Sequence, residues 1–135
     1  MDLAKTLHIS AAGMKAQGVR LRVLSENVAN ADSVARTPDG DPYRRKLVTF
    51  ANEMNKELGI HQVKIDNVEV DPGEFGQEYR PGHPAANEQG YIKTPNVNSL
   101  IEMSDMREAQ RSYEANLKVI ESSRSMLMRT IDLLR

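Results

Sequence analysis

The 135-residue chain has no cysteine and no tryptophan, and aromatic residues make up only 4% of it. The absence of cysteine excludes disulfides, thiolate metal sites and a cysteine nucleophile. With so few aromatic residues, the core must be built mainly from aliphatic side chains and from the seven methionines, whose flexible thioethers fill irregular gaps. The formal net charge is only −1, so we expect no nucleic-acid partner.

Long apolar runs are also missing. No stretch of the sequence is apolar enough to cross a bilayer, so we expect no direct membrane insertion. The first ten residues, MDLAKTLHIS, are interrupted by charged and polar groups and lack the apolar segment of a cleaved secretory signal. If the protein leaves the cytoplasm, we expect a route that does not read such a signal.

The C-terminal stretch 98–135 repeats mostly apolar residues alternately three and four positions apart, which is typical of a helix that packs lengthwise along a partner. Such a helix would be about 55 Å long at 1.5 Å per residue. A second apolar line, Val119, Met126 and Leu133, lies on another face, so we expect neighbours on two sides. The main seam is Met103, Met106, Gln110, Tyr113, Leu117, Ile120, Arg124, Leu127, Ile131 and Leu134.

A similar pattern predicts a helix from Leu3 to about Asn30, with a second apolar line on its opposite side. We expect Gly13, inside this helix, to let another backbone approach closely. One seam position holds Leu7, Met14, Leu21 and Val28, and the other holds Leu3, Ser10, Gln17, Leu24 and Ala31.

Between the helices the period changes from seven to two. Residues 45–50 alternate as in a strand, residues 51–58 suit a short helix before Gly59, and residues 63–70 alternate with a phase slip that indicates either a β-bulge or two short strands. We expect 75–79 to return as a partner strand, and 34–43 and 80–89 to be loops. Ser99 and Glu102 match a capping box at the start of the last helix.

These patterns predict a mainly α protein with a small β insertion. The long terminal helices pack antiparallel as a coiled-coil-like inner domain formed by residues 1–31 and 96–135. Residues 32–95 form a loop and a small strand-containing module.

Several residues allow two interpretations. Asn27 and Asn30 either satisfy backbone groups at a subunit contact or belong to an ordinary helix C-terminus. The polar seam residues Gln17, Gln110 and Arg124 either fix the register of packing or reach solvent. The hydroxyl of Tyr113 either meets another subunit or the ring simply packs in a core, and the basic run 44–46 either contacts acidic groups of a neighbour or is a solvated strand start.

No pattern indicates catalysis. His8, His61 and His83 lie in separate segments without metal-ligand spacing, and no nucleophile elbow, phosphate loop or metalloprotease helix is present. We therefore predict no enzyme activity, no metal and no cofactor.

Three stretches resemble the proximal rod proteins of the bacterial flagellar basal body. They are SAAGMKAQGVRLRVLSENVANADS (10–33), TPDGDPYRRKLVTF (37–50) and GYIKTPNVNSLIEMSDMREAQRSYEANLKVIESSRSMLMRTIDLL (90–134). The first contains the ANxxS/T-like signature of axial rod and hook proteins. The resemblance covers both ends of the chain and roughly two-thirds of its length, whereas residues 51–89 carry little of it.

The resemblance implies a structural, self- and hetero-assembling subunit of the axial drive shaft, exported by the flagellar type III apparatus without a cleaved signal, in a rod that crosses the periplasm and transmits torque from motor to hook. Its partners would be other rod proteins, copies of itself and the export apparatus. The candidate assembly interface comprises Leu7, Met14, Leu21, Leu24, Asn27, Val28, Asn30, Met103, Met106, Gln110, Tyr113, Leu117, Ile120, Leu127, Ile131 and Leu134.

Two rival hypotheses remain. One is a cytoplasmic coiled-coil adaptor or export chaperone, which would be found as a small soluble dimer. The other is a hydrolase that uses His61 or His83 with a carboxylate from the middle module.

Overall fold

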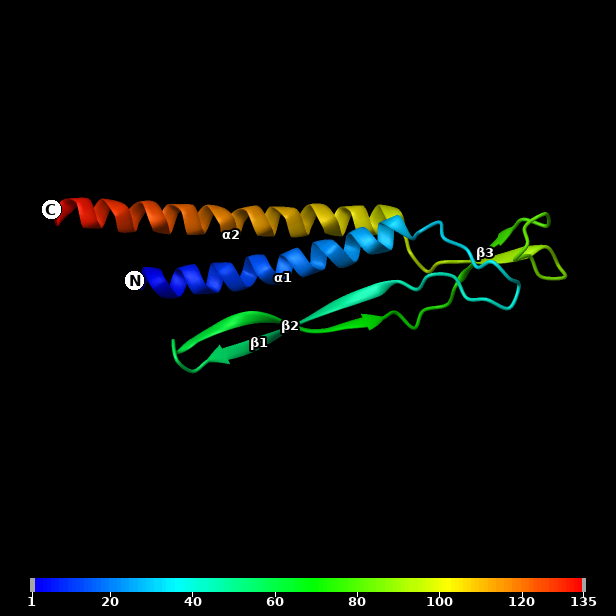
Figure 1. Ribbon diagram of the computed structural model, residues 1–135, viewed down its shortest axis with the longest axis horizontal. Coiled ribbons are helices and arrows are strands. Elements are labelled where there is room, and N and C mark those ends of the chain that lie inside the picture. The colour runs from blue at the N-terminus through cyan, green and yellow to red at the C-terminus, as the bar shows by residue number, and fades with distance from the viewer. Residues whose placement is uncertain (1, 135) are drawn as a thin grey trace. The chain divides into compact units, whose positions relative to one another are not determined.

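A computed structural model describes residues 2–134 of the chain. Helix α1 spans Leu3–Ala29 and helix α2 spans Ser99–Leu133. Between them lie strands β1 (Lys46–Asn55), β2 (Ile60–Val70), β3 (Gly76–Tyr79) and β4 (Tyr91–Thr94) (Figure 1). The predicted fold class, two long terminal helices around a small strand-containing middle, is confirmed.

The chain divides into two compact units. The first unit contains Met1–Leu21, Val48–Asn67 and Arg107–Arg135, and the second contains Arg22–Leu47 and Val68–Met106. Each unit therefore draws on both terminal helices and on the strands between them.

The helices pack antiparallel in the first unit, as predicted. Arg20 forms an ion pair with Glu108 at 3.7 Å. Earlier in α1, a Cβ atom placed on Gly13 would lie 3.0 Å from the side-chain amide of Asn116, later in α2. Residue numbers thus rise along one helix as they fall along the other. The sequence predicted that another backbone lies close to Gly13, whereas the group that lies there is the Asn116 side chain.

Both helices begin with a polar cap, but the predicted capping box is wrong. The Asp2 carboxylate accepts a hydrogen bond from the Ala4 amide at 3.1 Å at the start of α1. At α2 the cap is Asn98, whose side-chain oxygen accepts from the amides of Leu100 and Ile101 at 3.1 and 3.3 Å. Glu102 does not reach back to cap the helix, because buried partners hold its carboxylate.

The hairpin of β1 and β2 corrects the sequence prediction at two points. Residues 51–58 do not form a helix: β1 continues to Asn55, and the chain turns at 56–59. The Asn55 side chain accepts from the Glu57 and Leu58 amides, and Gly59 has a φ of 62°. This tight turn ends strand β1. Strand β2 is continuous, so the interpretation as two short strands is wrong.

Strand β3 confirms the predicted strand at 75–79, although its partner is β4 rather than β2. The pairing is antiparallel, with Gly76 opposite Thr94 and Tyr79 opposite Tyr91. The two tyrosine rings meet edge to face at 5.3 Å between centroids. The sequence analysis did not predict β4, since four residues are too short to establish a period.

Gly90, in the turn before β4, has a φ of 83°, and a Cβ atom there would lie 2.8 Å from the Tyr79 ring. We expect Gly90→Ala to destabilise the β3–β4 sheet by about 1–3 kcal/mol, through backbone strain and steric overlap. Hydrogen exchange of the Arg80 amide, which donates to the Gly90 carbonyl, measures the change.

The control is Gly82→Ala, because a Cβ atom at Gly82 would meet no atom within 4 Å. Equal protection in the two variants would contradict the assignment of strain to Gly90.

Candidate functional site

A buried polar junction in the second unit centres on Asn27, near the end of α1, whose side chain is 0% exposed. Its amide nitrogen donates to the Lys46 carbonyl and to the Glu102 carboxylate, both at 2.9 Å. Its amide oxygen accepts from the Lys46 amide at 2.9 Å and from the Tyr43 hydroxyl at 2.8 Å. An asparagine side chain offers two donors and two acceptor sites, so all four are used.

Glu102, on the first turns of α2, is the charged centre of this junction and is also 0% exposed. Besides the bond from Asn27, its carboxylate accepts from the Arg45 guanidinium. Arg45 also pairs with Asp71 at 3.4 Å. A buried carboxylate is tolerated only with such partners, because an unpaired charge in the interior carries a large desolvation penalty.

The pKa of Arg45 reflects these ion pairs. Burial acts to lower the pKa of Arg45, but hydrogen bonds and attraction from Glu102, and then from Asp71, outweigh it and raise the pKa. The Arg45 cation is therefore held in its charged state.

The pKa values of neighbouring groups are shifted as well. Burial raises the pKa of Tyr43, so its hydroxyl stays a donor to Asn27. At the rim, the 2.9 Å ion pair of Lys46 with Glu26 lowers the pKa of Glu26 and raises that of Lys46.

Asn27, Asn30 and the basic run 44–46 bond to groups of their own chain. Asn27 satisfies backbone groups of its own chain, at Lys46, whereas the Asn30 amide donates to the Glu26 carbonyl at 2.8 Å, as in an ordinary helix C-terminus. The basic run 44–46 is half-buried and pairs within the chain, although the Lys46 side chain beside Glu26 stays 39% exposed. Arg44, for example, donates to the Gly73 carbonyl at 2.8 Å.

The helices meet in the first unit along a line of small or polar residues. On α2, Ala109 is 0% exposed and Ser123 is 2% exposed, while Asn116 between them faces Gly13. We call Ala109, Asn116 and Ser123 the contact line; they are spaced by sevens, and Glu102 stands one heptad earlier on the same helix. Small side chains allow two helices to approach closely.

The large seam residues lie beside or beyond this contact. One seam position, which we call the outer line, is exposed throughout: Gln110, Leu117, Arg124 and Ile131. Leu117 is 38% exposed and Ile131 is 54% exposed. Gln110 and Arg124 are exposed in the single chain.

The candidate interface residues fall into three groups. Leu24 and Asn27 are buried. Leu7, Met14, Leu21, Val28, Asn30, Met106, Tyr113 and Ile120 are half-buried. Met103, Gln110, Leu117, Leu127, Ile131 and Leu134 are exposed. The structure thus brings Asn27 into the junction and leaves much of the apolar seam uncovered.

Helix α2 also extends past the start of α1 in the first unit (Figure 1). Because Gly13 faces Asn116, Leu3 stands opposite about residue 126, and α2 continues to Leu133. The overhang is about seven residues, or about 10 Å. Met128 and Leu133 on it are 54% and 88% exposed.

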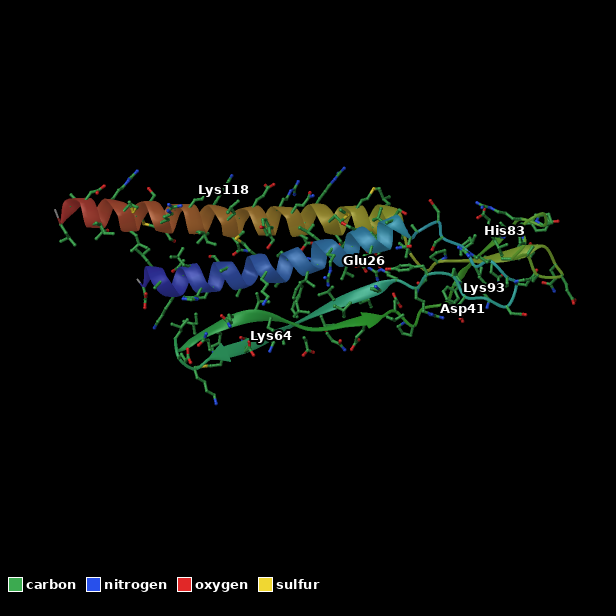
Figure 2. All side chains as sticks on the ribbon, viewed as in Figure 1. Glu26, Asp41, Lys64, His83, Lys93 and Lys118 are labelled. Atoms are coloured by element: carbon green, nitrogen blue, oxygen red, sulfur yellow. The ribbon has the colours of Figure 1, made fainter. Side chains whose placement is uncertain are left out.

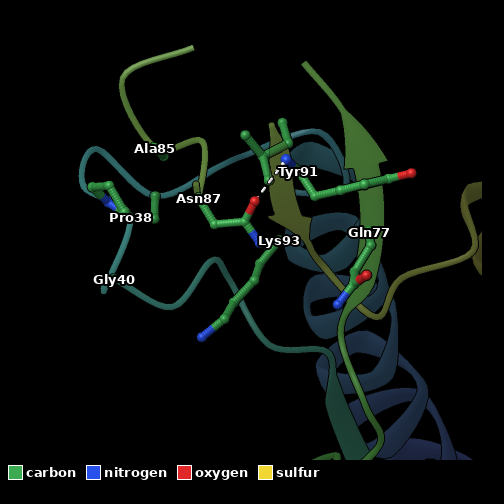
Figure 3. A pocket seen from close by; sticks show the side chains of 9 residues that line it. Pro38, Gly40, Gln77, Ala85, Asn87, Tyr91 and Lys93 are labelled. Carbon is green, nitrogen blue, oxygen red and sulfur yellow. Dashed lines mark hydrogen bonds between the residues drawn. The ribbon is translucent and has the colours of Figure 1, made fainter. Parts of the chain in front are cut away.

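A pocket of about 70 Å³ lies in the second unit, between the loop at Pro38 and Gly40 and the β3–β4 sheet (Figure 3). The Asn87 side chain closes one side by accepting from the Tyr91 amide at 2.9 Å. At its mouth Lys93 pairs with Asp41 at 3.0 Å (Figure 2). Cofactor pockets are several times larger, so this pocket suits a structural role.

Within residues 2–134, no group of three or more His, Asp or Glu side chains has the arrangement of a metal site. None of the helices described has the length and hydropathy needed to span a bilayer.

Comparison with known proteins identifies the class. Residues 88–133 match the family model described as flagellar basal body rod FlgEFG protein C-terminal. The whole chain is 52% identical to the flagellar basal-body rod protein FlgC of Agrobacterium fabrum over 133 residues, covering 98% of this chain and 96% of the relative. It is 38% identical to FlgC of Salmonella typhimurium over 133 residues, covering 98% of each. The FlgC protein of Borreliella burgdorferi is also 38% identical, over 152 residues that cover 100% of this chain and 99% of the relative.

Long terminal helices that leave apolar lines uncovered, together with these matches, define the class of flagellar basal-body rod proteins. The chain belongs to the FlgC family of that class. It is accordingly a structural subunit of the proximal rod of the flagellar basal body, as the resemblance implied.

Sequence analysis missed the junction partners Glu102, Arg45 and Tyr43. A signal was present for Glu102, which stands at the same heptad position as Ala109, Asn116 and Ser123. A carboxylate in a line of small residues indicates a buried charge that needs a cation.

We expect Asn27→Asp to destabilise the second unit by about 2–5 kcal/mol, because the new carboxylate cannot donate to Glu102 or to the Lys46 carbonyl and adds a like charge. Faster hydrogen exchange of the Lys46 amide would report the loss. The matched control is Asn30→Asp, whose half-buried side chain makes one backbone bond. Similar protection in the two variants would contradict the central role of Asn27.

Proposed function

We propose that this rod subunit assembles with copies of itself and with other rod proteins into a tubular shaft that crosses the periplasm and transmits torque from motor to hook. The observation that carries the proposal is that Leu117 and Ile131 on the outer line of α2 are exposed while the contact line inside is small and polar. The single chain buries small side chains and leaves Leu117 and Ile131 exposed. Its largest apolar contacts can therefore form only with other subunits.

Energetics support assembly. Burying one exposed leucine or isoleucine stabilises by roughly 1.5–3 kcal/mol. In the single chain the side chains of Leu133 and Leu134 are 88% and 85% exposed. Several such residues on each subunit supply enough apolar area to drive association, and head-to-tail contacts that do not close produce a helical filament.

The proposal has three further parts. The chain is exported by the flagellar type III apparatus without a cleaved signal, and it has no enzymatic role. Residues 1–31 and 96–135 form the inner helical layer of the shaft, and residues 32–95 form the module outside it. The assembly interface comprises the seam residues named above, with Asn27 acting from within by fixing the junction on which the helix ends rest.

We expect Leu117→Asp to abolish incorporation into the rod, because a charge would have to be buried at a subunit contact. The single chain should keep its helix content, since Leu117 is 38% exposed. Isolation of basal bodies, motility assays and circular dichroism of the purified protein measure these outcomes.

The control is Ala115→Asp, an exposed position on another face of α2. Normal motility of the Leu117→Asp strain would contradict the proposal. Recovery of the wild-type chain only as a small cytosolic dimer would favour the adaptor hypothesis instead.

We expect removal of the first ten residues to abolish export or incorporation, because α1 would lose Leu7 and the buried Ser10. The amount of the chain in the basal-body fraction, compared with the amount in the cytoplasm, distinguishes the two losses. Normal incorporation of the truncated chain would show that the start of α1 is not needed for assembly.

A further inference from the structure

Segments that are far apart in the sequence hold the backbone of Arg45 in the polar junction. Its carbonyl accepts a hydrogen bond from the Asp71 amide at 2.8 Å, which closes the base of the β1–β2 hairpin. Its amide donates to the Asn96 side chain at 2.8 Å, on the segment that leads into α2. The Arg45 backbone therefore takes this position when the two strands have met and the chain has returned to the helices.

The Arg45 side chain then connects the insertion to the helix ends. Its guanidinium donates to the Glu102 carboxylate, which is 0% exposed and also accepts from Asn27 at 2.9 Å. The bond between Asn27 and Glu102 joins the end of α1 to the start of α2. The buried anion thus belongs to a helix, whereas its cation belongs to the insertion. Without that cation, burying the carboxylate would cost more than a hydrogen bond from a neutral amide contributes.

We propose that this ion pair makes the docking of the two helix ends conditional on the folding of the insertion. While the insertion is open, Arg45 is not held against Glu102, the carboxylate stays in water, and the helix ends remain undocked. When the hairpin base closes, Arg45 neutralises Glu102 and the bond from Asn27 forms. Undocked helix ends fray, because most helical stability in proteins comes from tertiary packing. Residues 22–29 and 99–106 therefore become protected only after the insertion has folded.

The condition has a consequence for the rod that rests on the proposed function. A chain whose insertion is unfolded presents no completed helix ends to neighbouring subunits, so it is kept out of the assembly. The condition itself concerns one chain. The purified full-length protein therefore tests it without any measurement of incorporation into the rod.

The charge of Glu102 distinguishes this device from an ordinary loss of packing around Arg45. If Arg45 contributed only packing, its removal would loosen the helix ends whatever stood at position 102. If Arg45 supplies the charge that allows Glu102 to be buried, neutralising Glu102 should restore docking although the cation is missing.

The experiment measures hydrogen exchange in the purified wild type, in Arg45→Met, in Glu102→Gln and in the double variant. In Arg45→Met we expect exchange of the amides of 22–29 and 103–106 to become roughly a hundredfold faster, because a buried charge has lost its partner. In the double variant we expect most of this protection to return, since no uncompensated charge is left to bury.

The matched control is Arg44→Met, one residue earlier. The Arg44 guanidinium donates to the carbonyls of Asp71 and Gly73, and not to a carboxylate. Whatever exchange this variant shows at the helix ends, we expect the addition of Glu102→Gln to leave it unchanged.

A second variant opens the hairpin base without changing a charge, and it keeps the test decisive if Arg45→Met does not fold. Asn96→Ala removes the acceptor of the Arg45 amide, so we expect faster exchange both at the Asp71 amide and at the helix ends. Adding Glu102→Gln should slow exchange at the helix ends and leave the Asp71 amide exchanging fast.

Three results would overturn the proposal. Wild-type protection of the helix ends in Arg45→Met would show that Glu102 is buried without its cation. Equally fast exchange, or a failure to fold, in both Arg45→Met and the double variant would show that the insertion does not act through this charge. Rescue of Arg44→Met by Glu102→Gln would show that neutralising Glu102 stabilises the chain in general. All three leave the proposed function standing, because absence of the wild-type chain from basal bodies is what would overturn it.

Discussion

The close approach of the two helices along the contact line requires small side chains there. This requirement determines which side chains of α2 are left exposed. Two helices approach closely only where neither carries a large side chain, and Gly13 against Asn116 leaves no room for one. Ala109 and Ser123 on α2 are likewise small and buried. Once the small residues are committed to the inner contact, helical geometry turns the leucines and isoleucines of the neighbouring heptad positions outward. The exposed seam is therefore a consequence of how the chain folds on itself, and not an accident of composition.

The polar junction solves a different problem, the point where an insertion leaves a helix pair. Strand β1 begins and β2 ends beside the end of α1 and the start of α2, so many backbone groups there lack a regular partner. Asn27 satisfies both backbone groups of Lys46, and Arg45 joins Glu102 to Asp71. The Asn27 amide and the ion pairs of Arg45 thus hold together the ends of α1 and β2 and the starts of β1 and α2, without a large apolar core. This suits a protein in which few hydrophobic residues of the described chain are buried, among them three alanines, Ala16, Ala85 and Ala109.

Helix existence and limits could be predicted from the sequence, because periodicity over twenty or more residues is a strong signal. The hairpin was predicted only in part. The segment 51–58 has the composition of a helix, yet the turn held by Asn55 and Gly59 ends a strand instead. The four-residue strand β4 is too short to show a period. The heptad pattern identified which residues are apolar, but not which line pairs within the chain, since that depends on side-chain volume at the contact. Likewise, the junction joins residues up to 75 positions apart, and single-sequence patterns do not encode such pairings.

The division between small residues inside and large ones outside has a mechanical consequence. A free subunit held by alanine, glycine and serine contacts along its helices is compliant, because little dispersion energy resists bending or sliding. In the proposed assembly, contacts between neighbours at the exposed leucines and isoleucines would add stiffness, so rigidity would be a property of the assembled subunits.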